Sequence, residues 1–250
     1  FAADSPYNVA MVELEEGPKL MTNIVDIPTG NLSELPIGMP VEAIVRACAA
    51  RGVDVLVDGA HAPGYLALDI RAIGAAYYTG NLHKWCCAPK GSALLYVRPD
   101  RQERGKPVTI SHGENSKRTD RSRYRLNFDM VGSRDYGPWV LAPESIDFIG
   151  TLGGSDGWAG VRKRMYALAA EGGRLITEAL RPWGTRTLGP ESMLGAMRAH
   201  TLPTPRGGVV GETKYNDPLQ DRLQQRWGIQ VPVHTVPTAE GGLRVVRLSA

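Results

Sequence analysis

Hydrophobic positions along the chain follow two different periods, and together these predict an α/β arrangement. Apolar side chains recur at 41, 44, 45, 48 and 49, which is the spacing of one helix face. Pro40 suits the first turn of this helix, and Gly52 suits its end. A valine-rich run at 53–57 follows, apolar except for Asp54, as expected for a parallel strand that is covered on both faces. Helix followed by strand and loop is typical of wound α/β folds.

The rest of the pattern predicts a large domain over 1–165 and a small α+β domain over 166–250. In the large domain we expect two short β-like runs before residue 28, a short helical segment around 68–73, strands at 75–79 and 93–97, and a polar, loop-rich stretch at 100–127. A long helix over 157–180 leads into strands at 194–202, 229–234 and 243–248 and a helix at 218–227. The domain boundary is expected within the long helix.

Three chemically versatile side chains stand where apolar runs end. Asp58 closes the run at 53–57, His61 follows three residues later, and Lys84 follows the run that ends near Thr79. In wound α/β sheets, ligands sit beyond the carboxyl ends of the strands, so these side chains face one ligand if the two strands are neighbours. From spacing alone, a structural ion pair between the lysine and the aspartate is an equally good interpretation.

A pyridoxal phosphate (PLP) site is the sharper alternative. Such a site needs a lysine amine that forms a Schiff base with the cofactor aldehyde. It also needs a carboxylate beside the pyridine nitrogen, because PLP withdraws electrons only while that nitrogen stays protonated. Asp58 and Lys84 supply both groups, and His61 stands where an imidazole can reach the ring oxygen.

Two motifs resemble a known family. The stretches "VDGAHAPG" and "TGNLHKWCCAPKGSALLYVRPD" are similar to the class V aminotransferase superfamily of PLP enzymes, in the branch that includes isopenicillin N epimerase and cysteine desulfhydrase-like C–S lyases. The likeness continues through "ISHG", "VGSRDYGPW" and "LRVVRLSA", and so covers about 40–250. It implies a PLP-dependent transferase type I fold, with part of a large domain built on a mainly parallel sheet and a small C-terminal α+β domain.

The resemblance also implies roles for residues at matching positions. Lys84 is the Schiff-base lysine and catalytic proton shuttle, and Asp58 and His61 contact the pyridine nitrogen and the ring oxygen. The cofactor phosphate is bound by the following residues: Asn81, His83 and, from the neighbouring subunit of a homodimer with shared active sites, Ser133. Arg247 matches the arginine that binds the α-carboxylate of an amino-acid substrate, and a bidentate guanidinium suits that group. Arg244 competes for this role.

The expected function is that of a PLP-dependent enzyme acting on a small-molecule amino-acid substrate, most like isopenicillin N epimerase, as epimerase or C–S lyase. Transamination stays open. A persulfide-forming desulfurase is disfavoured, because the chain has no cysteine after Cys87. One alternative is a catalytically impaired fragment or pseudoenzyme, since nothing in 1–40 matches the family's phosphate loop and both ends of the chain look cut. Another is a metal hydrolase using Asp58, His61, His83 and His112.

Composition narrows the class of partner. A net charge of +3, with basic residues concentrated only at 115–125, argues against nucleic-acid binding. No apolar run reaches the roughly 20 residues that span a bilayer, so we expect no membrane association. Cys48, Cys86 and Cys87 have no metal-site spacing and form no evident disulfide framework, which indicates a reducing, cytoplasmic compartment.

Overall fold

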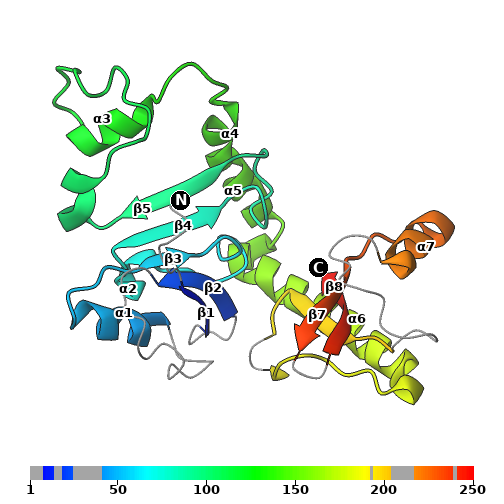
Figure 1. Cartoon of the computed structure of the whole chain (residues 1–250). Coiled ribbons are helices and arrows are strands. Elements are labelled where there is room, and N and C mark those ends of the chain that lie inside the picture. Colours follow the sequence, from blue (N-terminus) through cyan, green and yellow to red (C-terminus); the bar gives the residue numbers. More distant parts are fainter. Residues whose placement is uncertain (1–7, 14–18, 25–40, 192–193, 204–216, 239–240) are drawn as a thin grey trace. The chain divides into compact units, whose positions relative to one another are not determined.

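The computed structural model describes residues 8–13, 19–24, 41–191, 194–203, 217–238 and 241–250 (Figure 1). The chain forms two compact units, Phe1–Leu152 and Gly153–Ala250. The division falls just before the long helix α6 (Gly157–Ala179), whereas the sequence pattern places the domain boundary within that helix, between 165 and 166. A glycine-rich segment accounts for the difference. Gly154 and Gly157 adopt positive φ angles, and these interrupt the regular backbone at the start of α6.

The first unit is built on a five-stranded sheet in the order β1-β2-β3-β4-β5. Its strands are β1 (Asn8–Glu13), β2 (Lys19–Ile24), β3 (Leu56–Asp58), β4 (Tyr77–Asn81) and β5 (Ala93–Val97). β3 and β4 run parallel, with Asp58 in register with Thr79. Val57 and Tyr78 are partners in this register and are both fully buried, so the centre of the sheet lies in the core.

The expectation of a mainly parallel sheet does not hold for the described strands. The pairs β1–β2, β2–β3 and β4–β5 are antiparallel, and the described sheet is therefore mixed. Connection length accounts for the direction of β5. A parallel return needs a crossover of a dozen or more residues, usually with a helix, as between β3 and β4. The connection 82–92 contains no helix and turns the chain back as an antiparallel edge strand.

Two helices support the β3–β4 pair. In α1 (Val41–Ala49) the buried side chains are Val41, Ile44, Val45 and Cys48, which confirms the predicted helix face at these four positions, whereas Ala49 is exposed. α2 (Ile70–Ile73) lies on the crossover between the two strands. Asp69 caps α2 by accepting from the backbone N–H groups of Arg71 and Ala72 at 2.9 and 3.0 Å. Gly74 ends α2 with a φ of 74°.

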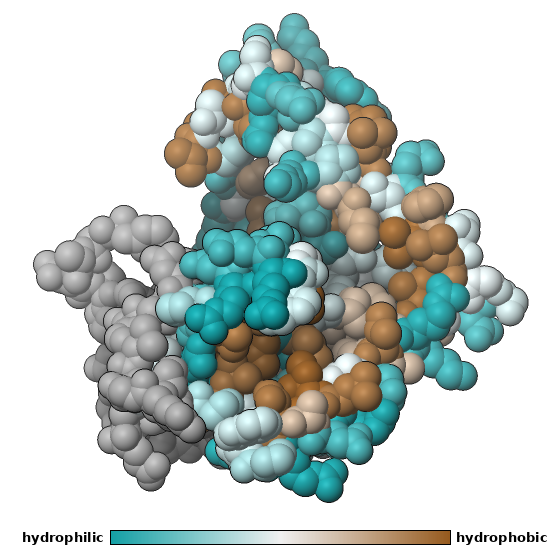
Figure 2. Space-filling model, turned by 90° about the vertical axis from the view of Figure 1, so that its right-hand side faces the viewer, coloured by the Kyte–Doolittle hydropathy of each residue, from teal (hydrophilic) through white to brown (hydrophobic). Residues whose placement is uncertain are grey.

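The rest of the first unit comprises η2 (Pro99–Arg104), α3 (Arg123–Asp129), α4 (Gly137–Val140) and α5 (Ala142–Thr151). The sequence pattern does not predict α4 and α5. The apolar side chains Val140, Leu141, Phe148 and Leu152 in this region are exposed, so no buried stripe marks the helices. Figure 2 shows one face of the molecule, on which apolar patches lie between hydrophilic ones.

The second unit is a small α+β structure, as the sequence predicts. It contains α6, η3 (Gly154–Asp156), η4 (Arg181–Trp183), α7 (Pro218–Trp227) and the antiparallel strands β6 (Met197–Thr201), β7 (Val233–Thr238) and β8 (Gly241–Ser249). The sheet order is β6-β8-β7. Helix α6 approaches β6 closely at Gly173, where an added Cβ would lie 2.9 Å from the Cδ atom of Arg198.

Candidate functional site

The site lies where the parallel strands β3 and β4 end together. Asp58 is the last residue of β3, and Lys84 follows the last residue of β4 after a short turn. The backbone N–H of Gly59 donates to the carbonyl of Thr79 at 2.9 Å, which extends the pairing of the two strands past Asp58. The strands are therefore neighbours, as the proposed ligand site requires.

The carboxylate of Asp58 is exposed and is oriented by its own turn. Its Oδ1 accepts from the backbone N–H of Ala60 at 3.0 Å, and no second protein donor to this carboxylate is found among the described residues. Gly59 is required beside it, because a Cβ at that position would lie 2.0 Å from the hydroxyl oxygen of Tyr78. Asp58 thus stands above a buried ring with one carboxylate oxygen already fixed.

The ring of Tyr78 lies beneath the turn that carries Asp58. The side chain is fully buried, and its hydroxyl has no hydrogen-bond partner among the described residues. Burial, and secondarily the charge of Asp58, raises the pKa of Tyr78, so that the phenol stays protonated. Sequence reasoning missed this residue, because it reads as one more apolar position in a strand.

The loop that carries Lys84 is braced by its own backbone. The N–H of Cys87 donates to the carbonyl of Lys84, and the N–H of Ala88 donates to the carbonyl of Leu82, each at 3.1 Å. The carbonyl of the fully buried Ser92 accepts from the N–H of Leu82 at 3.1 Å. Lys84 is therefore presented by a fixed turn, and the buried serine before β5 is a second residue that the sequence did not single out.

The hydrogen bonds of His83 decide which of its ring nitrogens carries a proton. Nδ1 lies 2.9 Å from the carbonyl oxygen of Ser92, and a carbonyl only accepts, so the proton is on Nδ1. In the neutral ring Nε2 is then an acceptor. His83 donates from Nε2 to a phosphate only as the doubly protonated cation.

The opposite arrangement holds at His61. The indole Nε1–H of Trp85 donates to Nδ1 of His61 at 3.4 Å, and an indole only donates. The neutral ring therefore carries its proton on Nε2, the tautomer that can donate to a ligand oxygen. Trp85 also packs against Tyr65, with ring centroids 5.0 Å apart. Trp85 thus packs against Tyr65 and orients the ring of His61.

The two adjacent cysteines differ. Cys86 is buried, and burial raises the pKa of its thiol to about 11, which keeps it protonated and apolar. Cys87 is exposed and has a φ of 53°. Cys86 therefore packs as a small buried hydrophobe, whereas Cys87 does not.

The other predicted residues are placed as follows. Asn81 is the last residue of β4 and pairs with Ala93 of β5. Ser133 is exposed on the segment between α3 and α4. Arg247 is exposed on β8, and thus belongs to the second compact unit. Arg244, its competitor, donates to Asp217 at 2.7 Å and is committed to that pair.

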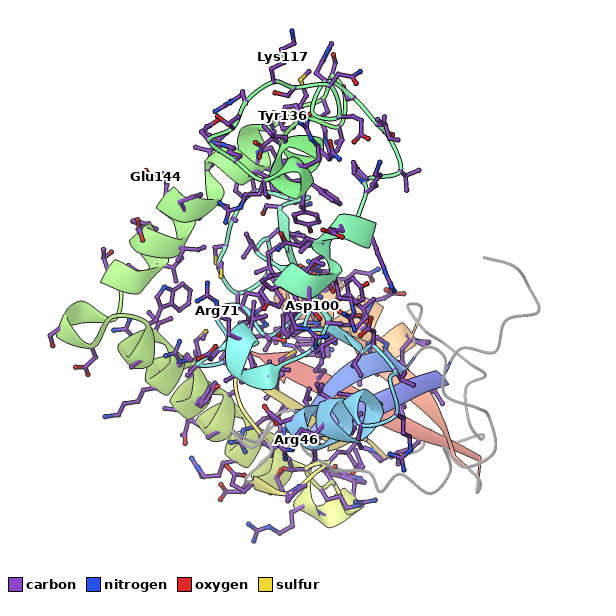
Figure 3. The ribbon with its side chains drawn as sticks, turned by 90° about the vertical axis from the view of Figure 1, so that its left-hand side faces the viewer. Arg46, Arg71, Asp100, Lys117, Tyr136 and Glu144 are labelled. Atoms are coloured by element: carbon purple, nitrogen blue, oxygen red, sulfur yellow. The ribbon has the colours of Figure 1, made fainter. Side chains whose placement is uncertain are left out.

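Three further features bear on the alternatives. Among the described residues, no three His, Cys, Asp or Glu side chains are gathered so that they could hold a metal ion. No described helix is long and apolar enough to cross a bilayer. The basic run is extensively paired with acids, since Arg118 meets Asp120 at 2.5 Å and Arg121 meets Asp129 at 2.6 Å. Lys117 of this run points away from the ribbon in Figure 3.

Comparison with curated proteins shows similarity over most of this chain. It is 32% identical over 225 residues to putative L-cysteine desulfhydrase 1 of Oryza sativa subsp. japonica, covering 87% of this chain and 42% of that protein. It is 34% identical over 224 residues to isopenicillin N epimerase of Streptomyces clavuligerus, covering 85% and 52%. The chain thus spans about half the length of these relatives. A family model described as ChsH2, C-terminal OB-fold domain, matches residues 1–46.

Solved structures share the fold at low sequence identity. An apo cysteine desulfurase from Thermococcus onnurineus NA1 superposes with a TM-score of 0.59 at 17% identity, covering 84% of this chain and 50% of that one. Alanine–glyoxylate aminotransferase from Nostoc sp. gives 0.56 at 15% identity, covering 85% and 53%. These neighbours have the type I fold, and this chain covers half of it. Sequence and fold together confirm that the chain resembles the class V aminotransferase superfamily of PLP enzymes, in the branch of isopenicillin N epimerases and cysteine desulfhydrases.

Proposed function

We propose that this chain supplies the lysine side of a PLP site, and that the protein acts on an amino acid as an epimerase or a C–S lyase. The observation that carries the proposal is the placement of Asp58 and Lys84 at the carboxyl ends of two adjacent parallel strands. A structural ion pair between them is the simplest competing interpretation.

The residues present fit PLP by the chemistry of their donors. Asp58 has a carboxylate oxygen without a protein donor among the described residues, and a protonated pyridine nitrogen would fill that position. His61 carries its proton on Nε2, as a contact to the ring oxygen requires. His83 and Asn81 flank the start of the lysine loop and are proposed to bind the phosphate, with His83 as a cation.

Bound PLP would withdraw electrons from the α-carbon of the substrate. Lys84 would hold and return the proton at that carbon, and its braced loop limits the positions from which it can do so. Arg247 is proposed to bind the substrate carboxylate, and the commitment of Arg244 to Asp217 favours Arg247 over its competitor. The names of the relatives support both epimerisation and C–S bond cleavage.

The first experiment tests the cofactor. The purified chain is mixed with PLP, and the visible absorption band is followed before and after borohydride. We expect a band that borohydride bleaches, absent in Lys84→Ala and retained in Lys90→Ala. Lys90 is the matched control, because it is an exposed lysine of the same loop. If Lys84→Ala retains the band, the assignment of Lys84 is wrong.

The same experiment decides the second candidate, a catalytically impaired fragment. This candidate is favoured by the fact that the chain spans only 42% and 52% of the two relatives above. Absence of any band in the parent chain would support it. A band without turnover of any amino acid would also support it, and would locate the defect after cofactor binding.

A second experiment separates the two reactions. Amino acids are offered in deuterated water, and label at the α-carbon is measured together with pyruvate and released sulfide or thiol. Label uptake with inversion at the α-carbon, without pyruvate, sulfide or thiol, supports the epimerase. Pyruvate together with sulfide or thiol supports the lyase. A keto acid that keeps the whole side chain of the substrate, formed without release of sulfide or thiol, would contradict both and indicate transamination.

We further propose a homodimer in which Ser133 reaches the phosphate site of the neighbouring subunit. Its exposure, and that of the apolar side chains Val140, Leu141 and Phe148 nearby in sequence, support a covering partner. Sedimentation of the parent chain and of Phe148→Ser would test this proposal, since the variant is expected to shift towards monomer. A cytoplasmic location is proposed as well, supported by the three free cysteines.

A further inference from the structure

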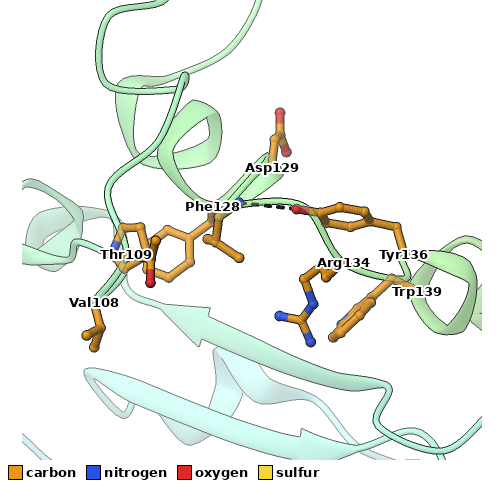
Figure 4. A pocket seen from close by; sticks show the side chains of 9 residues that line it. Val108, Thr109, Phe128, Asp129, Arg134, Tyr136 and Trp139 are labelled. Atoms are coloured by element: carbon orange, nitrogen blue, oxygen red, sulfur yellow. Dashed lines mark hydrogen bonds between the residues drawn. The ribbon is translucent and has the colours of Figure 1, made fainter.

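A cavity of about 590 Å³ opens beside helix α3, in a region that no proposed catalytic side chain lines. Its walls are formed by Pro107, Val108, Thr109, Phe128, Asp129, Val131, Arg134, Tyr136 and Trp139 (Figure 4). The volume lies within the range of small-molecule sites, and most of the lining is apolar. The charged side chains among the lining residues are Arg134 and Asp129.

The position of Arg134 is fixed by an aromatic ring. Its Cζ lies 4.3 Å from the centroid of the Trp139 ring, which is a cation–π contact. Figure 4 shows the guanidinium extending into the space beside Trp139 rather than lying along the ribbon. Because one face of the guanidinium plane is covered by the ring, the N–H groups at its edge remain to bind a planar acceptor.

The carboxylates near Arg134 are engaged elsewhere. Asp129 accepts from Arg121 at 2.6 Å, and Asp135 accepts from the backbone N–H of Gly137 at 2.8 Å. Within the part of the chain that the structure describes, no carboxylate lies within ion-pair distance of Arg134. An exposed arginine is ordinarily satisfied by water, but this one is also held in place over a mostly apolar cavity.

The backbone around Arg134 is held by Tyr136. The tyrosine hydroxyl accepts from the N–H of Val131 at 3.3 Å (Figure 4) and donates to the carbonyl of Gly132 at 2.6 Å. These bonds close the segment 131–136 into a loop that carries Arg134. A preformed loop loses little conformational entropy on binding, which favours a ligand site over a merely exposed side chain.

We propose that this cavity binds a small organic acid, whose carboxylate pairs with Arg134 and whose apolar body lies against Phe128 and Val131. A bare anion would use the guanidinium but gain nothing from the apolar wall. A neutral apolar molecule would leave the guanidinium without a partner. The lining therefore favours a ligand with both properties. Ser133, which is proposed to reach the phosphate site of the neighbouring subunit, belongs to the loop that carries Arg134 but does not line the cavity. Asp58, His61 and Lys84 do not line it either, so the inference rests on the lining residues and not on the proposed function.

Calorimetric titration of the full chain with benzoate, benzamide and inorganic phosphate tests the ligand class. We expect saturable binding of one benzoate per chain, with benzamide and phosphate each at least tenfold weaker. Equal affinity for benzamide would overturn the role of the charge. Equal affinity for phosphate would overturn the role of the apolar wall and leave a bare anion site. Absence of saturable benzoate binding would overturn the proposal as a whole.

Variants locate the binding. Arg134→Gln is expected to weaken benzoate binding at least tenfold, while Arg118→Gln leaves it unchanged. Arg118 is the matched control, because it is an exposed arginine of the same unit that does not line the cavity. Far-ultraviolet circular dichroism checks that each variant is folded. Because both positions are exposed, a folded Arg134→Gln protein that binds benzoate as tightly as the parent would overturn the assignment.

Discussion

Arg244 of β8 and Asp217 at the start of α7 form a buried pair that ties this helix to the sheet of the second unit. The Nε of Arg244 donates to Oδ2 of Asp217 at 2.7 Å, and its Nη2 binds the other carboxylate oxygen. Asp217 is fully buried and also caps α7 by accepting from the N–H of Leu219 at 2.8 Å. One carboxylate therefore satisfies a helix N-terminus and a guanidinium together, and Arg244 is not available to a substrate.

Asp217→Asn should destabilise the second unit strongly. The substitution leaves the largely buried Arg244 without its counter-charge, and breaking one side of a buried pair costs about 3–5 kcal/mol. Urea denaturation followed by circular dichroism measures the free energy of unfolding. Glu178→Gln is the control, because it breaks an exposed pair with Arg174 and should change stability by less than about 1 kcal/mol. Equal effects of the two variants would contradict the structural role of Asp217.

The same pair predicts a loss of stability in acid. The hydrogen bond from Arg244 lowers the pKa of Asp217 below its ordinary value. A lowered pKa in the folded state adds stability above the unfolded pKa of about 3.9, and that stability is lost as the pH falls through the folded pKa. The stability difference between the parent and Asp217→Asn should therefore shrink below about pH 4. Urea midpoints measured from pH 7 to pH 3 check this, and a constant difference would refute it.

His200 predicts a second pH dependence at higher pH. The ring is fully buried, its Nδ1 lies 3.3 Å from the hydroxyls of Thr177 and Thr187, and burial lowers its pKa. Because the unfolded chain then binds more protons, stability should fall as the pH drops below the unfolded value of about 6.5. We expect His200→Gln to flatten this slope between pH 7.5 and 5. A slope in His200→Gln as steep as in the parent would contradict this role of His200.

The close approach of Gly59 to Tyr78 predicts that two small substitutions change stability in opposite directions. Gly59→Ala places a Cβ 2.0 Å from the tyrosine hydroxyl oxygen and should cost about 1–3 kcal/mol or more. Tyr78→Phe removes a buried hydroxyl that has no partner among the described residues, so it should be neutral or stabilising by about 1 kcal/mol. Thermal unfolding compares them. A destabilised Tyr78→Phe protein would show that the hydroxyl makes a contact in solution.

Trp85→Phe tests the orientation of His61. Phenylalanine can keep the packing against Tyr65 but cannot donate to Nδ1 of His61. We expect a stability loss of about 0.5–1.5 kcal/mol and a shift of the His61 tautomer away from protonation at Nε2. Nitrogen NMR of the histidine side chains reports the tautomer. Trp227→Phe, at an exposed ring, is the control and should leave the His61 signals unchanged.

The local pattern of the sequence was enough to place most elements and the candidate residues along them. The helix at Val41–Ala49 follows from the spacing of its apolar side chains, and the helix at Pro218–Trp227 follows from its start and stop signals. The positions of Asp58 and Lys84 at the ends of apolar runs likewise come from the order of residues alone. Periodicity is a local property, so it survives without knowledge of what packs against each face.

Tertiary structure decided what depends on partners distant in sequence. Residues in contact across the fold set the mixed direction of the sheet, the tautomers of His61 and His83, and the commitment of Arg244 to Asp217. A hydrogen bond contributes energy only when both of its partners are in place. Asp217 and Arg244 are 27 positions apart, and the sequence carries no local sign of their pairing. The sequence by itself therefore determined which groups are present and in what order, while the packing of the chain decided which of them are already satisfied and which remain to act.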